Sequence, residues 1–136
     1  MNQLLQAGDR APSLPLLEEI LAGGPALLAF FKVSCPVCQF TFPFLERIAK
    51  SGSLRVFGVS QDDVKATGRF AKEFGVTFPM LLDEEPAGYP ASNAFGVSTV
   101  PTLFLIDASG AVALSSEGFL KRDLAGPGLT NADVLA

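Results

Sequence analysis

The sequence predicts an α/β fold, a mixed β-sheet flanked by helices, and three observations support this prediction. The apolar run at 25–33 has the length of a strand and lacks polar alternation, which is typical of a central strand covered on both faces. Strand-like and helix-like segments then alternate along the chain. Near the end, two apolar segments at 102–107 and 111–116 are joined by a short turn ending in glycine, which indicates a hairpin.

The N-terminal third begins with a Pro- and Gly-rich stretch at 7–16 that is expected to be extended. A short helix is expected over 16–24, ending at the Gly23–Gly24 pair because glycine readily caps a helix in the left-handed conformation. After the strand at 25–33, a helix is expected over 36–50, followed by a second strand at 53–60.

The helix at 36–50 begins at Pro36, which suits a first turn, and contains Pro43, which is expected to kink it. Its apolar residues recur at helical spacing and are expected to face the core, with charged residues on the other side. The apolar set is Val37, Phe40, Phe44, Leu45 and Ile48; the charged set is Glu46, Arg47 and Lys50.

Further along, Asp62 or Asp63 is expected to open a helix that Gly75 closes. A short strand is expected over 77–83 and a helix over 87–97, interrupted near Pro90. A closing helix is expected over 119–126.

Length and composition favour one domain spanning 1–136. Its 49% hydrophobic content and 12 phenylalanines suffice for a hydrophobic core. The net charge of −4 argues against binding to nucleic acid or to an anionic membrane. No stretch reaches the roughly 18 apolar residues of a membrane span. No signal peptide is visible, which favours the cytoplasm; a trimmed leader would instead place the protein in the periplasm or elsewhere outside the cytoplasm. The protein is expected to be a monomer.

The only two cysteines, Cys35 and Cys38, lie where the apolar strand meets the amphipathic helix. The first amides of a helix are unpaired and its dipole is positive there, so a thiolate at Cys35 would be stabilised. Cys38, one turn further on, is close enough to attack a disulfide held on Cys35. The spacing therefore favours a redox-active pair.

Three other interpretations of the pair compete with this one. A structural disulfide would close a tiny loop and stabilise little. A metal site would lack ligands, because zinc needs four and the chain has no histidine and no further cysteine. Two inert buried thiols are the third interpretation, which the strand-to-helix position disfavours.

The motifs FFKVSCPVC and STVPTLFLID, with Pro43 between them, resemble the thioredoxin fold. With GDRAPSLPL and FPMLLD, the chain is similar to the TlpA-like and redoxin branch of thiol-disulfide oxidoreductases, which borders on the peroxiredoxins. The similarity covers about 7–125 and leaves 126–136 as a tail without a structural prediction. It implies a three-layer domain that exchanges disulfides with protein partners, is reset by another redox protein, and needs no cofactor or metal.

By this resemblance Cys35 is the attacking thiol and Cys38 the resolving thiol. Pro101 corresponds to a cis-proline opposite the pair, and the backbone around Thr99 and Val100 would bind an extended segment of the partner. Three further residues, Pro36, Val37 and Lys32, have supporting places around the two thiols.

The chain also departs from the family pattern. Ser34 and Ala29 replace a common tryptophan and a buried acid, and Thr41 stands where some TlpA-like proteins have a glutamate, so no carboxylate is evident to accept the proton of Cys38. Lys32 is expected to be solvated rather than to stabilise the thiolate at Cys35.

The aromatic residues Phe40, Phe42 and Phe44 are expected in the core, with a lining of the partner surface as the alternative for Phe42.

Two rival functions remain. One is a thiol peroxidase in which Cys35 becomes a sulfenic acid, although peroxiredoxins typically have threonine where this chain has Lys32. The other is a non-catalytic binding module with the same fold, which would bind its partner fully after Cys35→Ser.

Overall fold

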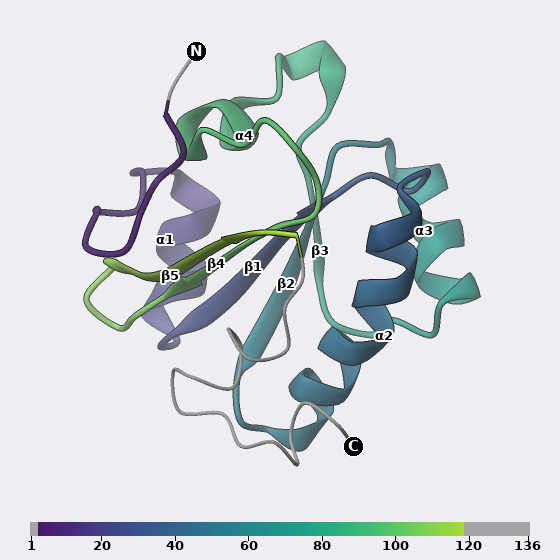
Figure 1. Ribbon diagram of the computed structural model, residues 1–136, viewed down its shortest axis with the longest axis horizontal. Helices are drawn as coiled ribbons and strands as arrows, with labels where there is room; N and C mark the ends of the chain where they lie inside the picture. Colours follow the sequence, from purple (N-terminus) through teal and green to yellow (C-terminus); the bar gives the residue numbers. More distant parts are fainter. Residues whose placement is uncertain (1–2, 119–136) are drawn as a thin grey trace.

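A five-stranded mixed sheet lies at the centre of the computed structural model, which describes residues 3–118 (Figure 1). The strand order is β3-β2-β1-β4-β5. The pairs β1–β2 and β2–β3 are parallel, and the pairs β1–β4 and β4–β5 are antiparallel. The strands are β1 Ala26–Phe31, β2 Arg55–Ser60, β3 Met80–Leu82, β4 Thr102–Ile106 and β5 Val112–Glu117.

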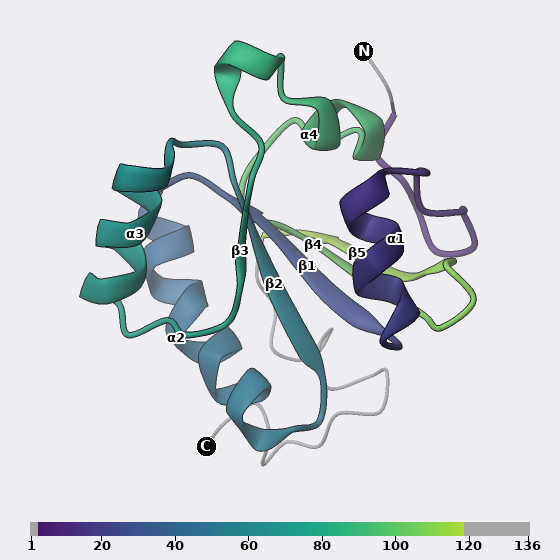
Figure 2. The ribbon, with the colours of Figure 1, turned by 180° about the vertical axis from the view of Figure 1, so that it is seen from behind.

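Helices cover both faces of the sheet and give the predicted three layers (Figure 2). Helices α2 and α3 lie on one face, and α1 and α4 on the other. The helices are α1 Pro15–Ala22, α2 Pro36–Ser51, α3 Val64–Glu73 and α4 Pro90–Phe95, with a 3-10 turn η1 at Glu85–Ala87. No helix within residues 3–118 is long and apolar enough to cross a membrane.

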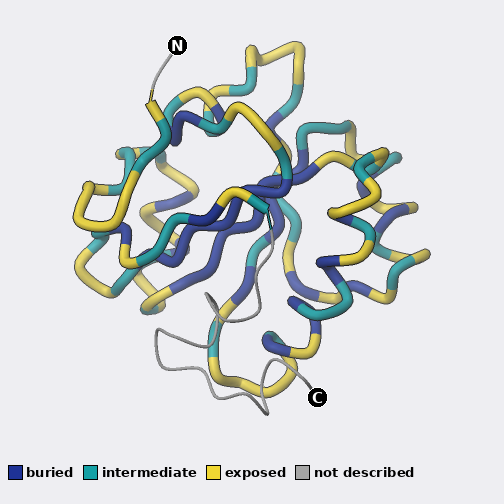
Figure 3. The backbone as a smooth tube through the Cα atoms, viewed as in Figure 1, coloured by how far each residue is buried: buried dark blue, intermediate teal, exposed yellow. Residues whose placement is uncertain are grey.

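Strand β1 is buried along its whole length, as its uninterrupted apolar sequence predicts (Figure 3). Successive side chains point to opposite faces of a sheet, so Leu27 and Phe31 pack with α2 and α3 while Leu28 and Phe30 pack with α1 and α4. The strand that ends at the two cysteines is therefore held between two hydrophobic clusters.

The prediction for α4 is wrong in one respect, because Pro90 begins this helix instead of interrupting it. Proline is tolerated in the first turn, where its missing N–H would have no intrahelical partner. The buried carboxylate of Asp83 fixes this start by accepting the N–H groups of Ala91 and Ser92, both at 2.8 Å. Helix α3 begins as expected, with Asp63 as its N-cap.

The predicted inner face of α2 is also partly wrong. Val37 is 49% exposed and Phe40 64% exposed, and Phe44 is only half-buried. The inner face instead comprises Cys38, Thr41, Phe42, Leu45, Glu46 and Ile48, so the alternative placing Phe42 on a partner surface is wrong as well. Three phenylalanines at every second position allow two helical stripes, and packing against β1 and α3 selects the one through Phe42.

Glu46 lies on the inner face because the segment after α3 offers it partners. Its carboxylate accepts the N–H groups of Thr77 at 2.8 Å and Phe78 at 3.3 Å, and the Thr77 hydroxyl. A buried carboxylate is tolerated when donors of this kind replace water. Helix α2 runs through Pro43, and the closing helix expected at 119–126, with the tail to 136, lies outside the described residues.

Candidate active site

The junction of β1 and α2 places the two cysteines at one end of the sheet. Cys35 is the N-cap of α2, and Pro36 occupies the first turn, where a proline fits without losing a hydrogen bond. The backbone N–H of Cys38 donates to Cys35 Sγ at 3.2 Å. Cys35 is half-buried and Cys38 fully buried, so the first sulfur can be reached from solvent and the second lies behind it.

The surroundings of Cys38 hold its thiol in the protonated state. Burial raises the pKa of Cys38 well above its usual range, and the hydrogen bond with the Cys35 side chain raises it further. The backbone of Lys32 also contacts this thiol and opposes the shift without reversing it. Cys38 is thus a reserve thiol that must lose a proton before it attacks.

The loop from Thr99 to Pro101 faces the cysteines. The Val100–Pro101 peptide bond is cis, as the resemblance implies, and Cys35 Sγ donates to the Val100 carbonyl at 3.7 Å. Thr99 is exposed, Val100 half-buried and Pro101 buried, and the Thr102 hydroxyl donates to the Thr99 carbonyl at 2.7 Å. The structure thus brings the predicted segment to within contact distance of Cys35.

Two side chains that the sequence analysis did not assign to the site fix the loop before Cys35. Asp62 Oδ2 accepts the N–H of Val33 at 2.8 Å, and Gln39 Nε2 donates to the Val33 carbonyl at 2.9 Å. The sequence suggests Asp62 only as a helix start, because a residue 29 positions away from Val33 gives no local signal for this contact. The loop is therefore anchored from the segment after β2 and from α2.

Lys32 is exposed and lines a small hollow beside this loop, together with Gln61 and residues 97–100. Within the described part of the chain it forms no ion pair. Of the other supporting residues, Pro36 and Val37 are both exposed next to Cys35. Gln61 is a second residue of the site that sequence reasoning missed.

The departures from the family pattern persist in the structure. Ala29 is buried in β1, and the Thr41 hydroxyl donates to the Val37 carbonyl at 2.6 Å, within its own helix. Besides burial, the contacts that shift the pKa of Cys38 come from Cys35 and from backbone groups. Residues 3–118 hold no cluster of three or more side chains suited to a metal ion.

Comparison with known proteins identifies the family. Residues 14–115 match the model of the AhpC/TSA family, a range that includes both cysteines and the Val100–Pro101 bond. The chain belongs to this family.

Relatives with names and solved structures agree with this assignment. The chain is 29% identical over 105 residues to the thiol-disulfide oxidoreductase ResA of Geobacillus thermodenitrificans, covering 74% of this chain and 59% of that one. It is 31% identical over 114 residues to the thiol:disulfide interchange protein DsbE of Xylella fastidiosa, covering 83% and 57%. The chain thus spans less than two thirds of the length of these two relatives.

A crystal structure from Chlorobium tepidum, described as a thiol:disulfide interchange protein DsbE, superposes with a TM-score of 0.73 at 26% identity, covering 96% of each chain. This similarity, and a thioredoxin domain from Bacteroides vulgatus with the same TM-score, show that the fold is thioredoxin-like.

Proposed function

We propose that this AhpC/TSA family member is a protein thiol-disulfide oxidoreductase. The observation that carries the proposal is the pairing of a half-buried sulfur, Cys35, which accepts the backbone N–H of Cys38, with the fully buried thiol of Cys38. Such a pair exchanges a disulfide with another molecule while the second thiol stays protected until it is needed. The names of the ResA and DsbE relatives support the same activity.

The reaction begins when the Cys35 thiolate attacks one sulfur of a partner disulfide. The partner's S–S bond breaks, a Cys35–partner disulfide forms, and the partner's other sulfur leaves as a thiolate that takes up a proton. Cys38 then gives its proton to water and attacks Cys35 Sγ, which releases the partner's first sulfur. The partner gains two electrons and the Cys35–Cys38 pair loses two, and another dithiol protein restores the reduced pair; the reverse sequence oxidises a partner.

The partner segment would lie along Thr99, Val100 and Pro101. The Val100 carbonyl already faces Cys35 Sγ, and the exposed Thr99 leaves the adjacent backbone accessible to an extended chain. Pro36 and Val37 are exposed at the start of α2, next to Cys35, and would contact the same segment. The partner therefore passes between the start of α2 and the loop before β4.

A redox titration tests the proposal. The full chain is equilibrated in dithiothreitol or glutathione buffers, and the thiols are trapped and counted, with Cys35→Ser as the control. We expect one reversible two-electron transition, near about −270 mV for a reductant such as thioredoxin or about −120 mV for an oxidant such as DsbA. If Cys35 and Cys38 form no disulfide in any buffer, the proposal is wrong and the binding module becomes the better interpretation.

A peroxide assay on the same samples distinguishes the rival enzyme. Lys32 supplies no hydroxyl at the position where peroxiredoxins typically have threonine, so we expect slow consumption of hydrogen peroxide. Fast consumption with a sulfenic acid on Cys35 would instead identify a thiol peroxidase.

A further inference from the structure

The small hollow beside Cys35 combines a fixed amide with a cation that forms no ion pair within residues 3–118. Its lining is Lys32, Gln61, Val97, Ser98, Thr99 and Val100. Two of these residues, Thr99 and Val100, belong to the segment proposed to bind the partner, and the Val100 carbonyl lies 3.7 Å from Cys35 Sγ. A partner cysteine joined to Cys35 would therefore place a neighbouring residue at the hollow.

Gln61 is held in position from two directions. Its backbone N–H donates to the Phe31 carbonyl at 3.1 Å, and its side-chain Nε2 donates to the Ser92 hydroxyl at 2.9 Å. Ser92 is itself fixed, because its hydroxyl donates to the buried carboxylate of Asp83 at 2.5 Å. A side-chain amide has two N–H groups, so one remains after the bond to Ser92.

The charge of the hollow comes from Lys32. Its side chain forms no ion pair with any described residue, whereas the nearby carboxylate of Asp62 already accepts the N–H of Val33 at 2.8 Å. An ammonium group and an amide N–H are both donors, and together they suit a carboxylate better than an amine or an apolar group. The chain as a whole is acidic, with a net charge of −4, so the positive charge of Lys32 is opposite in sign to that of the molecule.

We propose that Lys32 and Gln61 form a subsite for an acidic side chain adjacent to the cysteine that Cys35 attacks. The subsite rests on the proposed oxidoreductase function and names the class of partner segment: an extended stretch in which aspartate or glutamate flanks the reactive cysteine. Lys32 is then a specificity-determining residue that acts on the partner and leaves the Cys35 thiol itself unchanged.

The test uses short peptides, acetylated and amidated at their ends, each carrying one cysteine as a mixed disulfide with 2-thiopyridine. Glutamate, glutamine or lysine is placed on one side of the cysteine and then on the other. Release of 2-thiopyridone from the peptide by the reduced full chain reports the first exchange step. For the better side, we expect glutamate to react about threefold faster than glutamine and about tenfold faster than lysine at low salt, with the ratios shrinking in concentrated salt.

Two charge-reversal variants separate a subsite from a general charge effect. Lys32→Glu is expected to invert the preference between glutamate and lysine peptides. Lys72→Glu, at the exposed far end of α3, changes the net charge equally and is expected to preserve the preference. Equal shifts in both variants, or no preference in the unmodified chain, would overturn the subsite.

The glutamine peptide separates the two proposals. With Lys32→Gln, the glutamate peptide is expected to lose its roughly threefold advantage over the glutamine peptide, because the variant has no cation to attract the carboxylate. A parallel loss for all peptides would mean that Lys32 acts on Cys35, and the subsite would be wrong. If no peptide forms a disulfide with Cys35 in the unmodified chain, the oxidoreductase function itself fails.

Discussion

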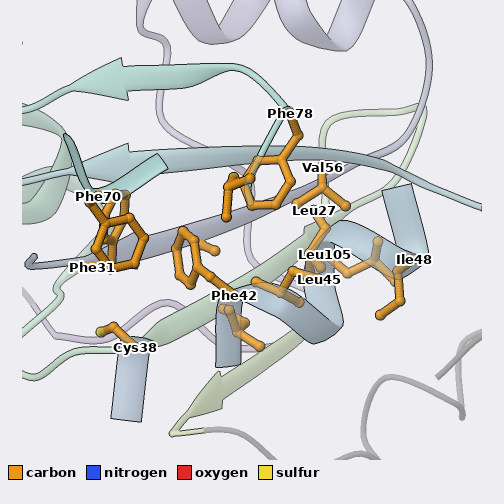
Figure 4. Close-up of a cluster of buried hydrophobic side chains, with 13 residues drawn as sticks. Leu27, Phe31, Cys38, Phe42, Leu45, Ile48, Val56, Phe70, Phe78 and Leu105 are labelled. Carbon is orange, nitrogen blue, oxygen red and sulfur yellow. The ribbon is translucent and has the colours of Figure 1, made fainter. Parts of the chain in front are cut away.

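Cys35 and Cys38 are both cysteines at the start of α2, yet they differ in burial and in hydrogen bonding. Cys35 caps the helix, is half-buried and accepts the N–H of Cys38, whereas Cys38 lies at the margin of the cluster around Phe31 and Phe42 (Figure 4). Burial raises the pKa of Cys38 well above its usual range. The order of attack in this pair therefore follows from exposure, since only the first sulfur is open to a large partner.

The largest effects are expected from replacing each thiol in turn. Cys35→Ser removes the accessible nucleophile, so the rate of disulfide exchange should fall by at least about a thousandfold, or roughly 4 kcal/mol in barrier. Cys38→Ser keeps the first step but cannot release the partner, so a stable Cys35–partner disulfide should accumulate. Mass spectrometry of non-reduced samples measures both; equal trapping through Cys38 in Cys35→Ser would contradict the comparison.

The contrast between a buried and an open position continues along α2 and can be tested with two phenylalanines. Phe42 is fully buried against Phe31, Phe70 and Phe78, whereas Phe40 is 64% exposed. Phe42→Ala should lower the free energy of unfolding by about 3–5 kcal/mol, because it leaves a cavity.

Phe40→Ala is the matched control and should lower the free energy of unfolding by no more than about 0.5 kcal/mol. Urea unfolding followed by circular dichroism measures both variants. Similar losses would show that α2 packs through the stripe that the sequence analysis expected.

Those two phenylalanines also show where prediction from sequence stops. The central strand, the helix after it and the position of the two cysteines at their junction are local patterns, and the structure shows all three. Which face of α2 is buried depends on partners outside it: Glu46 turns inward because Thr77 and Phe78 offer donors 31 and 32 residues away. Periodicity alone does not encode such long-range hydrogen bonds.

The same limit applies to the site. The cysteines and the segment ending at Pro101 were predicted, since each is a contiguous motif. Asp62 and Gln61 were not predicted as site residues, because single polar residues after a strand have no pattern of their own. Only the parallel pairing of β1 with β2 brings them beside the loop that precedes Cys35.

A smaller effect is expected from pH, through Cys38. Its ordinary pKa is 9.0 and the folded reduced protein raises it, so above about pH 9 the unfolded thiol loses its proton while the folded one keeps it. The stability contributed by the protonated thiol is complete below that pH and decreases above it, by at most about 1.4 kcal/mol per pH unit.

Unfolding of the reduced protein between pH 7 and 10, compared with Cys38→Ser, measures this slope. We expect the difference between the two proteins to be constant below pH 9 and to change only above it. A change already present near pH 7 would mean that Cys38 ionises more readily than its burial implies.

The smallest effect is expected at Thr41, one turn beyond Cys38 on the buried side of α2. Its hydroxyl donates to the Val37 carbonyl at 2.6 Å, and a neutral hydroxyl is too weak a base to hold the proton of Cys38. Thr41→Val keeps the shape and should change the free energy of unfolding by about 1 kcal/mol at most, and the rate at which Cys38 releases the partner by less than about twofold. Stopped-flow release from a preformed mixed disulfide, with Thr41→Ser as the control that retains the hydroxyl, measures this rate. A tenfold loss of this rate in Thr41→Val that Thr41→Ser does not share would show that the hydroxyl takes part in removing the proton of Cys38. Burial alone would then no longer explain why Cys38 reacts only after Cys35.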